Sequence, residues 1–255
     1  MDGDDGDRTP PLPESRWALF LDVDGTLTHH VARPQDVVLD ARVAPLLATL
    51  DDALQGAIAL VSGRSIVSLD ALFHPARPRH VAGLHGLEWR PGDGKVAPVP
   101  TVPQEWIARA RTIESVHPGA TVEAHGACLY LHWRAAPAAA PAFTALAHEI
   151  AGRVPTHRLH PGPHGIEIRP DGMDKGAAIR RFMRLPPFRG RVPVFAGDDP
   201  ADEPGFVAVN DMGGISVRVG ATARASAARY ALRGPAAVLD WLAGAHIGYE
   251  EARHG

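Results

Sequence analysis

This chain of 255 residues has little net charge, a single cysteine and no long apolar run. The formal net charge is −3, so no basic field attracts nucleic acid or an anionic membrane. Cys128 is the single cysteine, which excludes an internal disulfide and fits a reducing cytoplasm. The acidic first residues do not resemble a secretory signal, and no apolar run approaches the roughly twenty residues of a membrane span. We therefore expect a cytoplasmic protein without a membrane or nucleic-acid partner.

Lysine is scarce as well. Among 26 basic residues only Lys95 and Lys175 are lysines. An ammonium is a compact point charge, whereas a guanidinium is a planar fork, so the two are not interchangeable. A lysine within a motif of this arginine-rich chain is therefore a candidate for a specific role.

Strands and helices alternate at both ends of the chain. Apolar runs of parallel-sheet type predict buried strands at 15–21, 57–61, 192–196 and 215–219, and two short strands at 80–89. Helical spacing predicts helices at 37–54, 66–73, 174–183, 206–210 and 235–242. The alternation predicts an α/β fold, a doubly wound parallel sheet.

The middle third has a different pattern, helix-strand-strand, which occurs twice. The helices are expected at 104–116 and 137–152, and the strands at 121–124, 128–134, 158–160 and 166–169. We expect an inserted α+β module over 101–170, after a proline-rich joint at Pro98, Pro100 and Pro103. The core then comprises 16–100 and 171–255, and the polar, proline-rich residues 1–15 are expected to form a disordered tail.

Two carboxylates follow the first predicted strand, in the sequence Asp22-Val23-Asp24-Gly25-Thr26. Side chains at positions i and i+2 of a strand share a face, so Asp22 and Asp24 can converge on one point. With backbone N–H groups of the turn nearby, this arrangement can hold a hard cation and a phosphate together. An ordinary polar turn after a core strand is the alternative.

Four polar clusters follow predicted core strands or begin predicted helices, where open α/β sheets bind ligands. They are Asp22/Asp24, Ser62-Gly63-Arg64, Lys175-Gly176, and Asp198-Asp199 with Asp202-Glu203. Each has a simpler explanation, because Ser62, Asp198 and Asp199 could cap helices and Lys175 could be solvated. Their joint occurrence in this order favours a single site.

The clusters suit phosphoryl transfer. A carboxylate can attack phosphorus to form an aspartyl-phosphate, and a second can move the protons, so we assign Asp22 as nucleophile and Asp24 as acid and base. Mg²⁺ prefers carboxylates, water and phosphate oxygens. We expect Mg²⁺ at Asp22, Asp24 (through its carbonyl), Asp198 and Asp199. We expect the phosphate at Thr26, Ser62, Gly63 and Lys175.

This constellation resembles the haloacid-dehalogenase-like phosphohydrolases and, more narrowly, the trehalose-6-phosphate phosphatases. The resemblance covers about residues 16–245. Besides the four clusters, it is carried by Gly83-Leu84-His85-Gly86, Glu123, Leu131-His132-Trp133-Arg134 and Glu167-Ile168-Arg169-Pro170. It implies that the inserted module is a cap domain. The chain departs from the family at His125, where a lysine is common.

The resemblance implies Mg²⁺-dependent hydrolysis of trehalose 6-phosphate to trehalose and phosphate, the last step of trehalose biosynthesis. The partner would be a small sugar phosphate, whose hydroxyl groups suit carboxylate acceptors. The implied substrate-binding residues are Arg64, Glu123, His125, His132, Arg134 and Glu167.

Two alternatives stay open. The chain could be another sugar phosphatase of the superfamily, of the sucrose-phosphate or mannosyl-phosphoglycerate type. It could also be a non-catalytic sugar-phosphate sensor, since fold does not imply function. The presence of both Asp22 and Asp24 favours an enzyme over a sensor.

Overall fold

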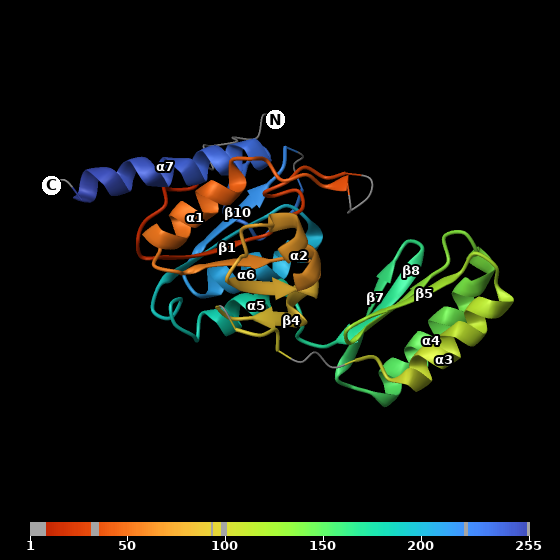
Figure 1. Cartoon of the computed structure of the whole chain (residues 1–255). Coiled ribbons are helices and arrows are strands. Elements are labelled where there is room, and N and C mark those ends of the chain that lie inside the picture. Colours follow the sequence, from red (N-terminus) through yellow and green to blue (C-terminus); the bar gives the residue numbers. More distant parts are fainter. Residues whose placement is uncertain (1–8, 32–35, 93, 98–100, 222–223, 254–255) are drawn as a thin grey trace, which may run out of the picture. The chain divides into compact units, whose positions relative to one another are not determined.

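A computed structural model describes residues 9–31, 36–92, 94–97, 101–221 and 224–253 (Figure 1). The chain divides into two compact units. The core unit combines residues 1–97 and 174–255, and the inserted unit is the continuous stretch 98–173. Among the described helices, none has the length and apolar character needed to cross a membrane.

The core unit is built on one seven-stranded sheet in the order β11-β10-β9-β1-β2-β3-β4. Its strands are β1 (Trp17–Leu21), β2 (Ile58–Val61), β3 (His80–Gly83), β4 (Glu88–Arg90), β9 (Val192–Gly197), β10 (Ile215–Val219) and β11 (Tyr230–Leu232). All neighbours pair in parallel except β3 and β4, which are antiparallel. Every residue of β1, β2 and β3 is buried, which explains their uninterrupted apolar sequences.

Helices cover both faces of this sheet. They are α1 (Val43–Ala53), α2 (Ile66–Phe73), α5 (Lys175–Phe182), α6 (Glu203–Asp211) and α7 (Pro235–Arg253). Figure 1 shows α1 beside α7 on one side and α5 beside α6 on the other. The predicted doubly wound α/β architecture is therefore confirmed. Beneath α5, Phe20 packs with its ring centroid 5.9 Å from that of Phe182 and 5.3 Å from that of Phe188.

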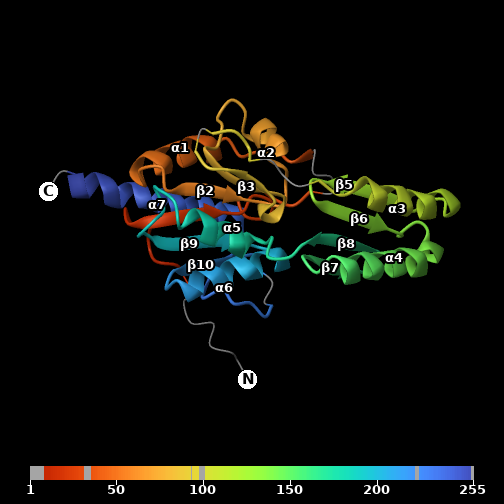
Figure 2. The same cartoon turned by 90° about the horizontal axis from the view of Figure 1, so that it is seen from below.

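The inserted unit has a four-stranded antiparallel sheet in the order β5-β6-β8-β7. Its elements are α3 (Gln104–Val116), β5 (Thr121–His125), β6 (Cys128–His132), α4 (Ala140–Arg153), β7 (His157–Gly162) and β8 (Gly165–Pro170). Helices α3 and α4 lie along one face (Figure 2). Alternate strand residues, Val122, Leu129, Leu131, Ile166 and Ile168, are buried against them. The intervening residues form a polar face, as expected for an antiparallel sheet covered on one side.

One helix boundary needs correction, and one strand was not expected. The helix predicted over 37–54 begins only at Val43, because Asp40 forms a turn in which its side chain accepts a hydrogen bond from the Arg42 N–H. Strand β11 was not predicted. Within the predicted disordered tail, residues 1–8 lie outside the described residues, but the Pro11 carbonyl accepts a hydrogen bond from Trp241 Nε1 at 2.9 Å. Pro98 and Pro100 of the predicted joint also lie outside the described residues.

Candidate active site

The predicted catalytic residues of the core unit gather at one edge of its sheet. Asp22, Ser62 and Asp198 each follow the carboxyl end of a strand, namely β1, β2 and β9, which are neighbours. After β1 the chain winds outward on one side through β2 and β3, and β9, β10 and β11 fill the other side. This reversal opens a crevice beside β1, where open α/β sheets bind ligands.

Lys175 is buried between two carboxylates. It is the first residue of α5, whose preceding residue Asp174 caps the helix by accepting a hydrogen bond from Ala177 N–H. Its Nζ donates to Asp22 Oδ1 at 2.7 Å and to Asp202 Oδ1 at 2.6 Å. Only 2% of Lys175 is exposed, so the alternative of a solvated lysine is wrong.

Asp202 is a site residue that the sequence analysis did not assign. It is completely buried. One oxygen accepts from Lys175, and the other accepts from the backbone N–H groups of Asp198 and Asp199, at 2.8 and 3.0 Å. Asp202 therefore fixes both the ammonium and the turn after β9. Its position four residues after Asp198, at the start of a helix, was the available signal.

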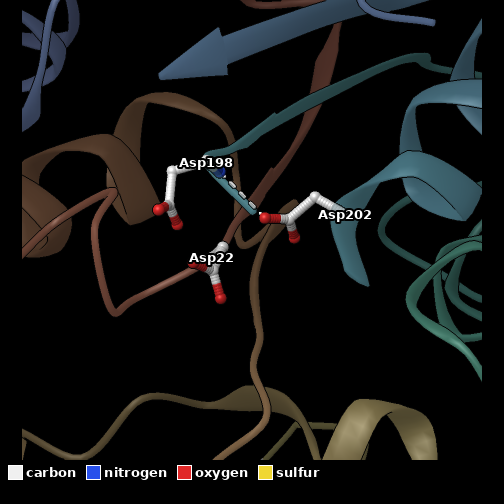
Figure 3. Close-up of side chains that lie close together, drawn as sticks. All are labelled: Asp22, Asp198 and Asp202. Atoms are coloured by element: carbon white, nitrogen blue, oxygen red, sulfur yellow. Dashed lines mark hydrogen bonds between the residues drawn. The ribbon is translucent and has the colours of Figure 1, made fainter. Parts of the chain in front are cut away.

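Asp22, Asp198 and Asp202 bring carboxylate oxygens within 4.8 Å of one another, and Figure 3 shows the three side chains close together. Both oxygens of Asp202 already have partners, whereas only Oδ2 of Asp198 has one and its buried Oδ1 has no hydrogen-bond partner in the described part of the chain. The same holds for Asp199 Oδ1. This donor set fits a hard divalent cation.

The pKa shifts of the clustered side chains also favour a bound cation. Burial raises the pKa of Asp22 to about 6, and the Lys175 ammonium opposes that shift. Burial also raises the pKa of Asp202 to about 7, with the charge of Asp22 adding to it. Burial alone would lower the pKa of Lys175, but the two carboxylates outweigh it and raise that pKa. The single ammonium of Lys175 neutralises only part of the negative charge of Asp22, Asp202 and the nearby Asp198. A further cation would therefore stabilise the site.

Gly25 allows the loop after β1 to approach Asp198. Its φ is +85°, in the left-handed region that favours glycine. A Cβ at this position would lie 2.2 Å from Asp198 Oδ2. Position 25 therefore requires a glycine, both for its backbone conformation and because Asp198 lies so close to it.

The Asp24 carboxylate faces Arg64 and lies outside the cluster. Arg64 Nε and Nη2 donate to Asp24 Oδ2 and Oδ1 at 2.6 and 2.7 Å, which is a bidentate pair. The sequence predicts that the Asp24 carbonyl contacts the metal and that Arg64 contacts the substrate. Those two roles stay predictions, and the structure adds a direct pairing between the two side chains.

Two of the predicted phosphate-binding residues, Thr26 and Lys175, contact Asp22 directly. Thr26, completely buried, donates through Oγ1 to Asp22 Oδ2 at 3.3 Å. Ser62 is 1% exposed, and its Oγ accepts from Arg64 N–H at 3.2 Å. The alternative that Ser62 caps α2 is wrong, since Ser65 accepts the capping hydrogen bond from Ser68 N–H. A Cβ on Gly63 would lie 2.8 Å from the His85 ring, so a larger residue there would displace that ring.

Two further contacts to the turn after β9 had no signal in the sequence. His30 Nε2 lies 2.7 Å from Asp198 Oδ2, across a separation of 168 residues. Arg224 donates to the backbone carbonyls of Asp198 and Asp199, at 3.2 and 2.9 Å. These contacts join the carboxylate and the backbone of the turn to distant parts of the core unit.

The remaining predicted residues belong to the inserted unit. Glu123, His125, His132 and Glu167 lie on strands β5, β6 and β8, and they alternate with residues buried under α3 and α4. They therefore share the polar face of that sheet. Arg134 is exposed in the turn after β6.

The family model described as trehalose-phosphatase matches residues 20–236. The chain belongs to the trehalose-phosphatase family. It is 40% identical over 242 residues to trehalose-6-phosphate phosphatase of Escherichia coli, covering 92% of this chain and 90% of that protein. It is 37% identical over 235 residues to a probable trehalose-phosphate phosphatase of Sinorhizobium fredii, covering 89% and 88%. A trehalose-phosphatase is a phosphoric monoester hydrolase, so the chain is an enzyme.

Solved structures agree on the fold of this trehalose-phosphatase family member. The structure of Aspergillus fumigatus trehalose-6-phosphate phosphatase superimposes with a TM-score of 0.72 at 24% identity, covering 94% of this chain and 99% of that one. A phosphatase of the haloalkanoate (HAD) superfamily from Bacteroides thetaiotaomicron superimposes with a TM-score of 0.61 at 16% identity, covering 97% and 99%. The fold is thus that of the HAD phosphatases.

Replacing Lys175 by arginine tests whether this trehalose-phosphatase needs a compact ammonium. We expect Lys175→Arg to lower kcat about a hundredfold, because a guanidinium does not fit between Asp22 and Asp202 without displacing one of them. Phosphate release and the melting temperature should both be measured. Lys95→Arg is the matched control, since Lys95 is the other lysine and is exposed. Equal kcat values for the two variants would contradict this role of Lys175.

Proposed function

We propose that this phosphatase hydrolyses trehalose 6-phosphate to trehalose and phosphate, which completes trehalose biosynthesis. The observation that carries the proposal is the buried Asp22–Lys175–Asp202 arrangement beside Asp198, in a chain of this family. The substrate comes from the relatives, of which the Escherichia coli protein is named for trehalose 6-phosphate.

In the proposed first step, a carboxylate oxygen of Asp22 attacks phosphorus. A P–O bond to Asp22 forms while the P–O bond to the sugar breaks, and Asp24 gives its proton to the departing sugar oxygen. Thr26 and Lys175 hold the two oxygens of Asp22, which orients the nucleophile. Lys175 also places positive charge where the transferred phosphoryl group gains negative charge.

In the second step, Asp24 takes a proton from water, and that water attacks phosphorus. The P–O bond to Asp22 breaks, inorganic phosphate leaves, and both aspartates return to their starting state. Asp24 lies outside the acidic cluster, and the guanidinium of Arg64, which donates to both of its oxygens, would orient it for both steps.

We infer that Mg²⁺ is the cation, held by Asp22 and Asp198 with a further contribution from Asp199 and the Asp24 carbonyl. When bound, it would neutralise phosphate charge so that an anionic nucleophile can approach. The buried Asp198 Oδ1 and Asp199 Oδ1 support this assignment, since both need a partner. Asp202 would hold Lys175 instead, because both of its oxygens are engaged.

The direct test is phosphate release from trehalose 6-phosphate by the purified full chain with Mg²⁺, with Asp22→Asn as background. Sucrose 6-phosphate and mannosyl-phosphoglycerate are assayed separately as alternative substrates. We expect kcat/KM to favour trehalose 6-phosphate by about two orders of magnitude or more. A higher kcat/KM for either alternative substrate would show that trehalose 6-phosphate is not the preferred one. Phosphate release at background level from all three would refute the activity.

Sugar recognition is assigned to the glutamates of the inserted unit. We expect Glu123→Ala and Glu167→Ala to lower kcat/KM for trehalose 6-phosphate by about tenfold to a hundredfold each, because each removes an acceptor for sugar hydroxyl groups. Hydrolysis of nitrophenyl phosphate, which has no sugar, should stay unchanged. Equal losses on both substrates would show that these residues act through the fold.

A further inference from the structure

A row of four side chains crosses the polar face of the inserted unit's sheet. The strand register places Glu123 of β5 opposite Tyr130 of β6, Tyr130 opposite Glu167 of β8, and Glu167 opposite His160 of β7. Neighbouring strands lie roughly 4.8 Å apart, so the row extends over about 14 Å. Because β6 and β8 are the two central strands, Tyr130 and Glu167 occupy the middle of the face.

Tyr130 presents an aromatic ring at the centre of this row. It is half-buried, and its neighbours hold the ring in place. The His125 ring meets it edge-on with centroids 5.7 Å apart, and the His132 ring lies nearly parallel to it at 6.2 Å. Burial, and next the charge of Glu167, raise the pKa of Tyr130, so its phenol stays protonated at physiological pH.

Glu167 places a buried acceptor oxygen beside this ring. Its Oε1 is buried and has no hydrogen bond of ordinary geometry within the described part of the chain, although the Tyr130 hydroxyl and the Cys128 thiol interact with this carboxylate, and Oε2 lies 3.9 Å from Arg169 Nη1. A buried carboxylate oxygen without a donor is unfavourable, and a hydroxyl group would satisfy it. Glu123 lies on the other side of the ring and is half-exposed. Its Oε2 lies 3.1 Å from His125 Nε2.

We propose that Tyr130 is the platform on which a glucose ring of the substrate stacks, between hydroxyl acceptors supplied by Glu123 and Glu167. The proposal rests on the proposed function and adds a specificity-determining residue to it. A pyranose has an apolar C–H face and a rim of hydroxyl groups, so a ring flanked by two carboxylates is complementary to both parts. Two carboxylates in one row disfavour a phosphate, which assigns this surface to the neutral sugar.

The test is a kinetic comparison of Tyr130→Ala and Tyr130→Phe in the full chain, with trehalose 6-phosphate and nitrophenyl phosphate as substrates. We expect Tyr130→Ala to raise KM for trehalose 6-phosphate about tenfold or more, and to leave nitrophenyl phosphate hydrolysis unchanged. Tyr130→Phe keeps the ring and should stay close to wild type. Tyr130→Leu, which keeps apolar volume in the strand, repeats the test if the alanine variant folds poorly.

Trp106→Ala is the matched control, because Trp106 is an aromatic residue of α3 packed into the core on the opposite side of this sheet. It should not change the ratio of the two activities. An unchanged KM for trehalose 6-phosphate in Tyr130→Ala, equal losses on both substrates, or a phenylalanine variant as weak as alanine would each overturn the platform. Wild-type protein that hydrolyses nitrophenyl phosphate but not trehalose 6-phosphate would instead refute the proposed substrate and this inference with it.

Discussion

Asp22→Asn is expected to lower phosphate release by about four orders of magnitude or more, because an amide oxygen is a poor nucleophile and no aspartyl-phosphate can form. The substitution preserves the size of a side chain that is only 3% exposed. The amide oxygen can still accept from Lys175, so the fold of the core unit should survive. Initial rates with saturating trehalose 6-phosphate and Mg²⁺ measure the effect.

Two controls make the result specific. Circular dichroism and thermal unfolding must show that Asp22→Asn is folded. Asp211→Asn is the matched aspartate substitution, since Asp211 is exposed at the end of α6 and pairs with Arg180 on the surface. It should retain full activity. A folded Asp22→Asn enzyme with more than about a hundredth of the wild-type rate would exclude Asp22 as the nucleophile.

Asp24→Asn is expected to separate the two halves of the reaction. With trehalose 6-phosphate, kcat should fall about a hundredfold to ten-thousandfold, because the departing sugar oxygen needs a proton. With nitrophenyl phosphate, nitrophenolate leaves without that proton, so the aspartyl-phosphate should still form and then persist. Rapid mixing should therefore show a burst of nitrophenolate close to one equivalent of enzyme, followed by slow turnover.

The asparagine is a conservative change at this position. It can keep one of the two hydrogen bonds from Arg64, but it cannot carry a proton between the steps. Asp22→Asn should give no burst, which shows that the burst depends on the nucleophile. Slow turnover of nitrophenyl phosphate by Asp24→Asn without a burst would mean that Asp24 is not the base of the second step.

Residues that are close in the sequence were predictable, because local patterns encode them. The apolar strand before Asp22, the glycine that follows Asp24, and the cap of α5 just before Lys175 all lie within a few positions of the group they serve. Strands β2, β9 and β10 were predicted because buried parallel strands have continuous apolar sequences. The order of these strands along the chain was then enough to indicate a doubly wound sheet.

Pairings between distant segments were not predictable. The bidentate contact of Arg64 with Asp24 and the contact of His30 with Asp198 depend on how separate loops pack. Asp202 was visible as an acidic residue, but its role as partner of Lys175 required the position of α5 relative to the turn after β9. Strand β11 has only three half-buried residues, so it lacks the apolar run that marked its neighbours.

The position of β9 beside β1 has a consequence for how the protein is made. Trp17 pairs with Val192, so the apolar strand β1 leaves the ribosome long before its neighbour exists. The inserted unit, in contrast, is one continuous stretch with a hydrophobic core of its own. Sheets built from distant segments form slowly, and their unpaired edges associate with other chains in the meantime. We therefore expect the nascent inserted unit to fold first, and newly synthesised chains to depend on chaperones until residues 192–197 have emerged.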